Sequence, residues 1–292
     1  MAHILTSRAI EQITMILSAI VLIILGFSVV GAIFGSVIGF FSSLISVIII
    51  LHKYFLDVFQ GMLKLKMDFK EEIKIAYKII SFSIPVILTA ISEIGIYSMT
   101  TTIMPLFITI SEVGYFGIAE PIARLPLMIS NSLATTILPV TSEMFASKNT
   151  NILKKYMFNA LRYNLIIMVP ICLFIMIFSK EVLLVMFFTK PFYSKGANVL
   201  TILTLGMFFY SIFAITSSMI QGAGKPKSSM YLLIGGFIQI LLLSFIFIPY
   251  FGVNGGAIST TLTTATMTLI SLIYLNKHIS LKFNIGHYLK IL

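Results

Sequence analysis

Three ionisable residues, Arg124, Glu120 and Glu93, lie within long apolar stretches of the sequence. Charged side chains are costly inside a membrane, so each of them calls for a functional hypothesis. Glu120 precedes Arg124 by four residues, which puts both side chains on one face of a helix, where they can pair. Two interpretations of Arg124 stay open. It forms a structural ion pair with Glu120, or its guanidinium fork faces a cavity and binds an anionic group such as a pyrophosphate.

Glu93 lies among residues with hydroxyl groups in a second apolar stretch: Thr89, Ser92, Ser98, Thr100, Thr101 and Thr102. A carboxylate with hydroxyl oxygens nearby is suited to bind a coupling proton or sodium ion. The alternative is a protonated, hydrogen-bonded glutamic acid with a structural role. Because consecutive helices are usually adjacent, Glu93 is also a possible partner of Arg124.

The composition tells what kind of element must position these residues. Of 292 residues, 58% are hydrophobic and only 10% are charged, and the mean hydropathy is +1.05. Soluble domains are nearer 45–50% apolar and about 25% charged. This excludes an ordinary soluble enzyme, a disordered chain and a disulfide-rich domain. With about 20 residues per span, the apolar residues predict an all-α polytopic membrane protein of about eight transmembrane helices.

Prolines and glycines interrupt several of the eight expected spans. Repeated kinks favour a transporter bundle that lines a cavity over a single-span anchor. The first span has a cleaved signal peptide as its alternative, but no small-residue cleavage site follows it. The spans are expected at about 10–25, 31–51, 79–108, 115–140, 156–178, 196–220, 230–249 and 256–275.

The second span carries Gly31, Gly35 and Gly39 at four-residue spacing. Small residues at this spacing let another helix approach closely, which predicts helix packing rather than chemistry. Residues 52–78 then alternate lysines with apolar residues, a pattern typical of an amphipathic helix in the headgroup plane. A solvated linker is the alternative.

The basic residues predict the orientation of the chain. With both termini in the cytoplasm of a multi-pass cell-membrane protein, sixteen lysines and arginines lie inside and three outside, with Arg124 in a span. Cytoplasmic loops carry such an excess. The net charge of +10 therefore indicates orientation and contact with membrane lipids, and a nucleic-acid partner is not expected.

Other chemistry finds little support in the sequence. The four histidines lack metal-ligand spacing, and Gly222–Lys225 is followed by Pro226 where a P-loop needs Ser or Thr. No metal, no cofactor and no enzymatic activity are expected, and Cys172 is expected as a core residue. The hydroxyl residues of the last span, from Ser259 to Thr268, either line an aqueous cavity or bond to helix carbonyls.

One tripeptide occurs twice in the chain, and four further motifs follow each other in a characteristic order. Gly31-Ala32-Ile33 and Gly256-Ala257-Ile258 each open the second helix of a hairpin, which is suggestive of a parallel repeat. The others are Ser81-Phe82-Ser83-Ile84-Pro85, the segment Val113 to Ala119 that leads into Arg124, Gln221 to Lys227, and Phe251 to Ala257. Taken in order, they resemble the polysaccharide-exporter branch of the multidrug/oligosaccharidyl-lipid/polysaccharide flippase superfamily.

This resemblance implies two lobes of six helices. Residues 1–51 would be a two-helix remnant of the first lobe, 52–78 the basic linker, 79–278 a complete second lobe and 279–292 a cytoplasmic tail. The first four helices of the usual first lobe would be absent. It also implies a substrate, a lipid-linked oligosaccharide moved across the cytoplasmic membrane by alternating access. It supports Arg124 as a substrate-binding residue, and we expect Glu120 beside it to belong to the same binding site.

Two other functions stay open. A drug or cation antiporter of the same superfamily needs acidic cavity residues, for which only Glu93 and Glu120 are candidates. A non-transporting half-protein would need a companion chain to supply the missing helices.

Overall fold

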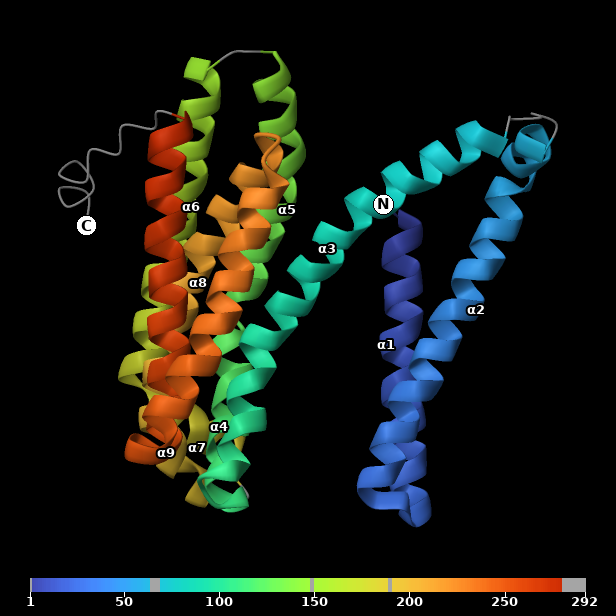
Figure 1. The fold of residues 1–292 in the computed structure, drawn as a ribbon. Helices are drawn as coiled ribbons and strands as arrows, with labels where there is room; N and C mark the ends of the chain where they lie inside the picture. Colours follow the sequence, from blue (N-terminus) through green and yellow to red (C-terminus); the bar gives the residue numbers. More distant parts are fainter. Residues whose placement is uncertain (1, 64–68, 148–149, 189–190, 280–292) are drawn as a thin grey trace. The chain divides into compact units, whose positions relative to one another are not determined.

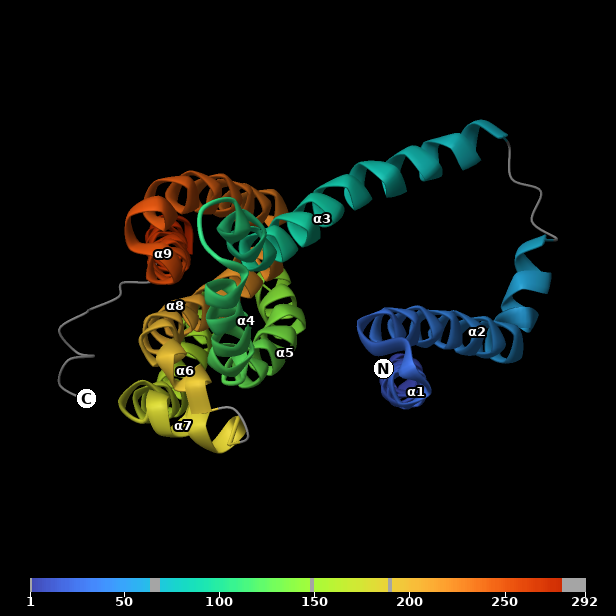
Figure 2. The same cartoon turned by 90° about the horizontal axis from the view of Figure 1, so that it is seen from below.

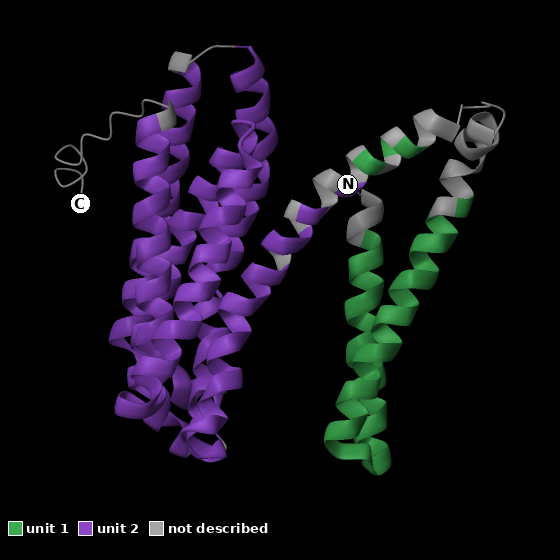
Figure 3. Cartoon of the chain, in the orientation of Figure 1, with its two compact units in different colours: residues 1–77 green, residues 78–292 purple. Residues whose placement is uncertain are grey.

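The computed structural model describes residues 2–63, 69–147, 150–188 and 191–279. Within these ranges the chain is almost entirely helical and contains no β-strand. The all-α polytopic fold predicted from the composition is therefore confirmed. The chain divides into two compact units, residues 1–77 and 78–292 (Figure 3).

Unit 1 contains a hairpin of two long helices, α1 (Ala2–Leu22) and α2 (Ser28–Leu63) (Figure 1). Between them, a π-helical turn over Ile23–Phe27 lets the chain reverse its direction. Gly26, in this turn, has a φ of 94°, a conformation that glycine adopts at little cost.

The three glycines of α2 lie on the face that packs against α1. A β-carbon at Gly35 would come within 2.7 Å of the Ala19 backbone, and one at Gly39 within 2.8 Å of the Met15 β-carbon. Gly31 comes similarly close to α1, with Leu22 at 3.0 Å. The two helices therefore approach more closely here than any larger side chain would allow.

The expected linker at 52–78 continues α2 as far as Leu63 and then forms the start of α3 (Phe69–Ile103). Its residues 64–68 lie outside the described residues, as do residues 280–292 of the expected tail.

Unit 2 contains the larger helical bundle (Figures 1 and 2). The part of α3 from Lys78 onward belongs to it. The other helices are α4 (Ile110–Arg124), α5 (Leu127–Ala146), α6 (Thr150–Ile177), α7 (Ser179–Met186), α8 (Ala197–Gly222) and α9 (Pro226–Ile279).

The long helix α9 is itself a hairpin, because its backbone leaves helical geometry at Gly252 (φ 57°, ψ −134°). Its two arms run side by side in Figure 1. Ser28, which begins α2, has nearly the same conformation (φ 47°, ψ −128°). The Gly-Ala-Ile tripeptide thus follows a turn of similar geometry in both hairpins.

The span expected at 115–140 is divided between α4 and α5 by a turn at Leu125 and Pro126, whose backbone dihedrals stay in the α-helical region while the hydrogen bonds become of the i+3 type. Pro126 has no N–H to donate and its ring crowds the preceding turn, which explains the change. Arg124 therefore lies where the two helices join, near the middle of the expected span.

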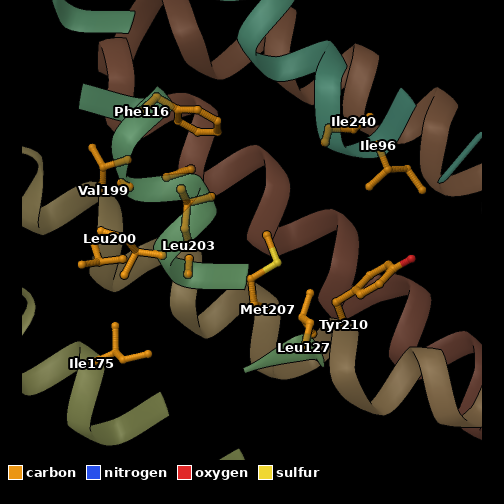
Figure 4. Packing of buried hydrophobic residues seen from close by; sticks show 14 of the residues in the cluster. Ile96, Phe116, Leu127, Ile175, Val199, Leu200, Leu203, Met207, Tyr210 and Ile240 are labelled. Atoms are coloured by element: carbon orange, nitrogen blue, oxygen red, sulfur yellow. The ribbon is translucent and has the colours of Figure 1, made fainter. Parts of the chain in front are cut away.

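Helix α8 is the centre of unit 2 and packs against α4, α5, α6 and α9. Figure 4 shows its side chains Leu203, Met207 and Tyr210 packed among Phe116 and Leu127 from the neighbouring helices. Most of α8 is buried on all sides, and its hydrophobic residues do not follow one stripe. A helix that is apolar all round is expected at the core of a bundle.

Hydroxyl groups of the second arm of α9 fix it against α8. Thr261 Oγ1 donates to the carbonyl of Ile202, and Thr268 Oγ1 to that of Phe209, both at 2.7 Å. Such bonds satisfy polar groups that would be costly in an apolar interior.

Five helical stretches of the described chain are long and apolar enough to cross a membrane. The first and the last contain the reversals at Gly26 and Gly252 and so supply two arms each. Their surfaces carry many exposed large apolar side chains, among them Ile24, Leu173 and Leu242, which suits contact with lipid. The five are Thr6–Ile50, Ile87–Leu106, Ile152–Ile177, Phe192–Gly222 and Pro226–Lys277.

Candidate membrane-embedded polar site

A cavity of about 460 Å³ opens within unit 2, between α3, α5, α8 and the first arm of α9. This is within the usual size range of small-ligand pockets. Its wall combines one carboxylate, two amides, several hydroxyls and two aromatic rings. The lining residues are Thr89, Glu93, Asn131, Ala134, Thr135, Leu138, Tyr210, Phe213, Ala214, Ser217, Ser218, Gln221 and Leu233.

Helical spacing explains why these residues share one cavity. Asn131, Thr135 and Leu138 follow each other by four and three residues on α5. Tyr210, Ala214 and the residues further along α8 repeat in the same way, and Thr89 and Glu93 are one turn apart on α3. Each helix therefore contributes one face to the wall.

Glu93 lies on this wall and accepts a hydrogen bond from the Tyr210 hydroxyl at 3.1 Å. Tyr210 is only 3% exposed, so its hydroxyl needs this acceptor. Glu93 itself is partly exposed towards the cavity. The carboxylate is thus held in place on one side and accessible to a ligand or ion on the other.

Arg124 forms its ion pair with Glu120, one turn earlier on α4. The pairing of Arg124 with Glu93 that helix adjacency suggested is wrong, because Glu93 bonds to Tyr210 instead. Arg124 is not among the residues that line the cavity. Its Nε is buried and has no hydrogen-bond partner in the described part of the chain.

Tyr97 connects the arginine with the cavity wall. The Arg124 guanidinium carbon lies over its ring, 3.8 Å from the ring centroid. The same ring makes an edge contact with Tyr210, with centroids 5.3 Å apart. Glu93, Tyr210, Tyr97, Arg124 and Glu120 therefore form one continuous chain of contacts across three helices.

The two tyrosines were not identified from the sequence. Tyr97 follows Glu93 by four residues on α3, a spacing that could have indicated it. Tyr210 lies 117 positions from Glu93, so only the fold brings them together.

A cluster of hydrogen bonds lies at the end of the cavity nearest the α8–α9 turn. The amide of Gln221 donates to the hydroxyls of Ser217 and Ser229, each at 3.2 Å, and the two serine hydroxyls are 2.5 Å apart. In contrast, the Asn131 amide nitrogen donates no hydrogen bond to the described part of the chain and is exposed. It is free to bond water or a ligand.

A second cluster of hydrogen bonds, formed by three buried residues, has a structural role. Ser130 of α5 donates to Asn164 Oδ1 at 2.7 Å, and Asn164 donates to Ser211 of α8 at 3.2 Å. All three residues are fully buried. The bonds tie α5, α6 and α8 together behind the cavity wall.

Other residues suggested by the sequence lie elsewhere. The hydroxyls of the last span do not line the cavity and bond mostly to helix carbonyls, as the packing interpretation predicted. Gly31, Gly35 and Gly39 belong to the hairpin of unit 1. No group of three or more potential metal ligands occurs among the described residues.

The helical spans, the apolar surface and the embedded polar cavity define a multi-pass α-helical membrane protein. The family comparison then identifies its relatives. Residues 5–291 match the family described as lipid II flippase MurJ, and the chain belongs to this family.

Two relatives of this chain are named as flippases. The probable low-salt glycan biosynthesis flippase Agl15 of Haloferax volcanii is 25% identical over 198 residues, which cover 67% of this chain and 42% of the relative. The lipid II flippase MurJ of Bacillus subtilis is 22% identical over 167 residues, covering 57% of this chain and 31% of the relative. The matched region is thus less than half of either relative.

Solved structures share the fold. A multidrug resistance MATE family transporter of the MOP superfamily, in an inward-facing conformation, has a TM-score of 0.76 at 19% identity and covers 94% of this chain and 63% of that one. The lipid II flippase MurJ in an inward closed conformation has a TM-score of 0.66 at 18% identity, with 92% and 55% covered. These similarities establish a common architecture.

Proposed function

We propose that this chain acts in moving a lipid-linked oligosaccharide from the inner to the outer leaflet of the cytoplasmic membrane by alternating access. The observation that carries the proposal is the polar cavity within the apolar bundle, with Glu93 on its wall and a tyrosine pair leading to Arg124. Membership of the lipid II flippase MurJ family supports it, since the two relatives described above are named as flippases.

Such a substrate poses a clear physical problem. Its lipid tail is soluble in the hydrocarbon of the bilayer, but its sugars and pyrophosphate would lose their hydration there at prohibitive cost in free energy. A polar cavity can replace that hydration. The amides of Asn131 and Gln221 and the hydroxyls of Thr135, Ser217 and Ser218 supply donors and acceptors for sugar hydroxyls.

Arg124 is proposed to bind the pyrophosphate. A guanidinium bonds phosphate oxygens through two parallel N–H groups. In the structure Glu120 neutralises the charge of Arg124, which lowers the cost of keeping a cation among apolar helices. The Arg124 side chain is 33% exposed, which leaves part of it accessible to a second acceptor.

Glu93 is proposed to bind the coupling ion, a proton or a sodium ion. It is a carboxylate on the cavity wall, with Thr89 one turn away. Motive force would come from the membrane potential or from an ion gradient. In this proposal both termini lie in the cytoplasm.

The test is a flipping assay in vesicles. The chain is reconstituted with a fluorescent lipid-linked oligosaccharide, and an impermeant quencher reports how much of it reaches the other leaflet. Vesicles that contain the chain should flip the lipid faster than protein-free vesicles, and an imposed ion gradient should increase the rate further. Transport of an organic cation in place of the lipid would overturn the proposal in favour of a drug antiporter.

The assay needs a second arm because the matched region is less than half of either relative. In this arm the chain is reconstituted together with a separate chain that carries the first-lobe helices of a relative. Flipping only in this arm would support a half-protein that needs a companion. Flipping in neither arm contradicts the proposed function.

A further inference from the structure

Tyr97 occupies the middle of the chain of contacts that joins Arg124 to the cavity. We propose that Tyr97 is a positioning residue, whose ring holds the Arg124 guanidinium in place for the anionic group of the ligand. This inference rests on the proposed function, because it takes Arg124 as the residue that binds phosphate.

The first argument is the geometry of the ring and the cation. The guanidinium carbon lies 3.8 Å from the Tyr97 ring centroid, well within the range of a cation–π interaction. This interaction acts on the charge and uses no N–H group. The ring can therefore hold the arginine without occupying a donor that phosphate oxygens need.

The second argument is the limited hold that Glu120 provides. Glu120 pairs with one terminal nitrogen of Arg124, on the same helix. A phosphate that binds Arg124 competes with that carboxylate for the same N–H groups. When the pair with Glu120 loosens, the ring from α3 is the contact that still fixes the guanidinium.

The third argument is that the ring is itself well supported. Its edge contacts Tyr210 at a centroid distance of 5.3 Å and an interplanar angle of 65°, a favourable T-shaped arrangement. Tyr210 is buried in the core, and its hydroxyl is bonded to Glu93. A side chain supported in this way loses little further freedom when a ligand binds.

The inference makes the ring essential and the hydroxyl dispensable. Tyr97→Phe keeps the ring, and Tyr97→Leu removes it. The matched control is Tyr231→Leu, because Tyr231 is 65% exposed and lies on α9, away from these contacts. The probes are polyprenyl pyrophosphate and the uncharged polyprenol of the same chain length, titrated onto the solubilised chain and followed by native mass spectrometry.

We expect the wild-type chain to bind the pyrophosphate more tightly than the polyprenol. Tyr97→Leu should weaken pyrophosphate binding about five- to thirtyfold, the range expected for a partly desolvated cation–π contact, and leave polyprenol binding unchanged. Tyr97→Phe and Tyr231→Leu should keep the wild-type preference.

Two results would overturn the inference alone. Either Tyr97→Leu binds pyrophosphate as tightly as wild type, or it weakens both lipids equally, as a general loss of packing would. Unchanged polyprenol binding shows that a weak Tyr97→Leu variant is still folded. A Tyr97→Phe variant that also loses the preference contradicts a role of the ring alone, because phenylalanine keeps the ring. A wild-type chain that binds both lipids equally contradicts the proposed role of Arg124, and this failure is distinct from the others.

Discussion

The hydroxyl of Tyr210 donates a hydrogen bond to Glu93 Oε1 at 3.1 Å, across 117 positions of the sequence. The bond joins α8, the central helix of the bundle, to the carboxylate on the cavity wall. One oxygen of Glu93 is thereby oriented by a rigid core residue. A coupling ion that binds Glu93 would meet a preorganised ligand. Its binding would also change the hydrogen bond to α8, the helix that most of the bundle packs against.

Tyr210→Phe removes this hydroxyl and keeps the ring against Tyr97. If Glu93 binds a sodium ion, loss of the hydrogen bond that orients its carboxylate should weaken the apparent affinity for sodium about tenfold. The measurement is the initial flipping rate as a function of sodium concentration and, separately, of an imposed pH gradient. Glu93→Gln should abolish the ion dependence in the same experiment. Full ion dependence in Glu93→Gln would exclude this role.

The buried bonds around Asn164 predict a difference between two serines on α5. Ser130 is fully buried and donates to Asn164 Oδ1, whereas Ser132 is exposed and bonds only within its own helix, to Met128. Ser130→Ala should lower stability by about 1 kcal/mol, and Ser132→Ala by less than about 0.5 kcal/mol. Thermal unfolding in one detergent compares them. Equal effects would show that the buried network contributes nothing specific.

The close approach of α8 and α5 predicts a contrast between two glycines. A β-carbon at Gly222 would lie 2.7 Å from the Thr141 β-carbon and 2.8 Å from the Leu138 carbonyl oxygen, whereas nothing lies within 4 Å of one at Gly235. Gly222→Ala should therefore destabilise the chain by about 1–3 kcal/mol through overpacking.

Gly235→Ala is the matched control and should be neutral or stabilising by up to about 1 kcal/mol, because alanine is the better helix former. Both are measured by thermal unfolding. A Gly222→Ala variant as stable as wild type would mean that the two helices separate without cost.

The proposed orientation predicts opposite labelling of two exposed lysines in unit 2. Lys155 lies near the start of α6, and Lys195 in the turn before α8. In a Cys172→Ala background, Lys155→Cys should react with an impermeant thiol reagent only from the cytoplasmic side, and Lys195→Cys only from the outside. Labelling of both from the same side would contradict the topology.

Much of the architecture could be predicted because a bilayer leaves few choices. Apolar stretches long enough to cross it must be helices, and the hairpins around Gly26 and Gly252 were expected where they occur. Which proline would interrupt the regular helical hydrogen bonds could not be predicted, since Pro121 and Pro139 lie inside α4 and α5 while Pro126 lies between them. Arg124 itself lies within the expected span.

The site was only partly predictable for a related reason. The pair of Glu120 and Arg124 follows from helical periodicity, which is local, and the structure contains it. The contacts of Glu93 with Tyr210 and of Tyr97 with Arg124 join different helices. They depend on how the helices are rotated and packed, and periodicity does not determine that.

The most direct test of the proposed function is the flipping rate of Arg124→Gln in vesicles, with Arg162→Gln as control, since Arg162 is an exposed cation on α6. Arg124→Gln leaves the partly buried Glu120 unpaired, so the double variant Arg124→Gln/Glu120→Gln is measured beside it to separate lost folding from lost ligand contact. We predict that both Arg124 variants flip the lipid-linked oligosaccharide at least about tenfold more slowly than wild type, a loss typical of a charge-assisted contact, and that Arg162→Gln flips it normally. Wild-type flipping by the folded double variant would contradict the account and leave Arg124 and Glu120 as a structural pair.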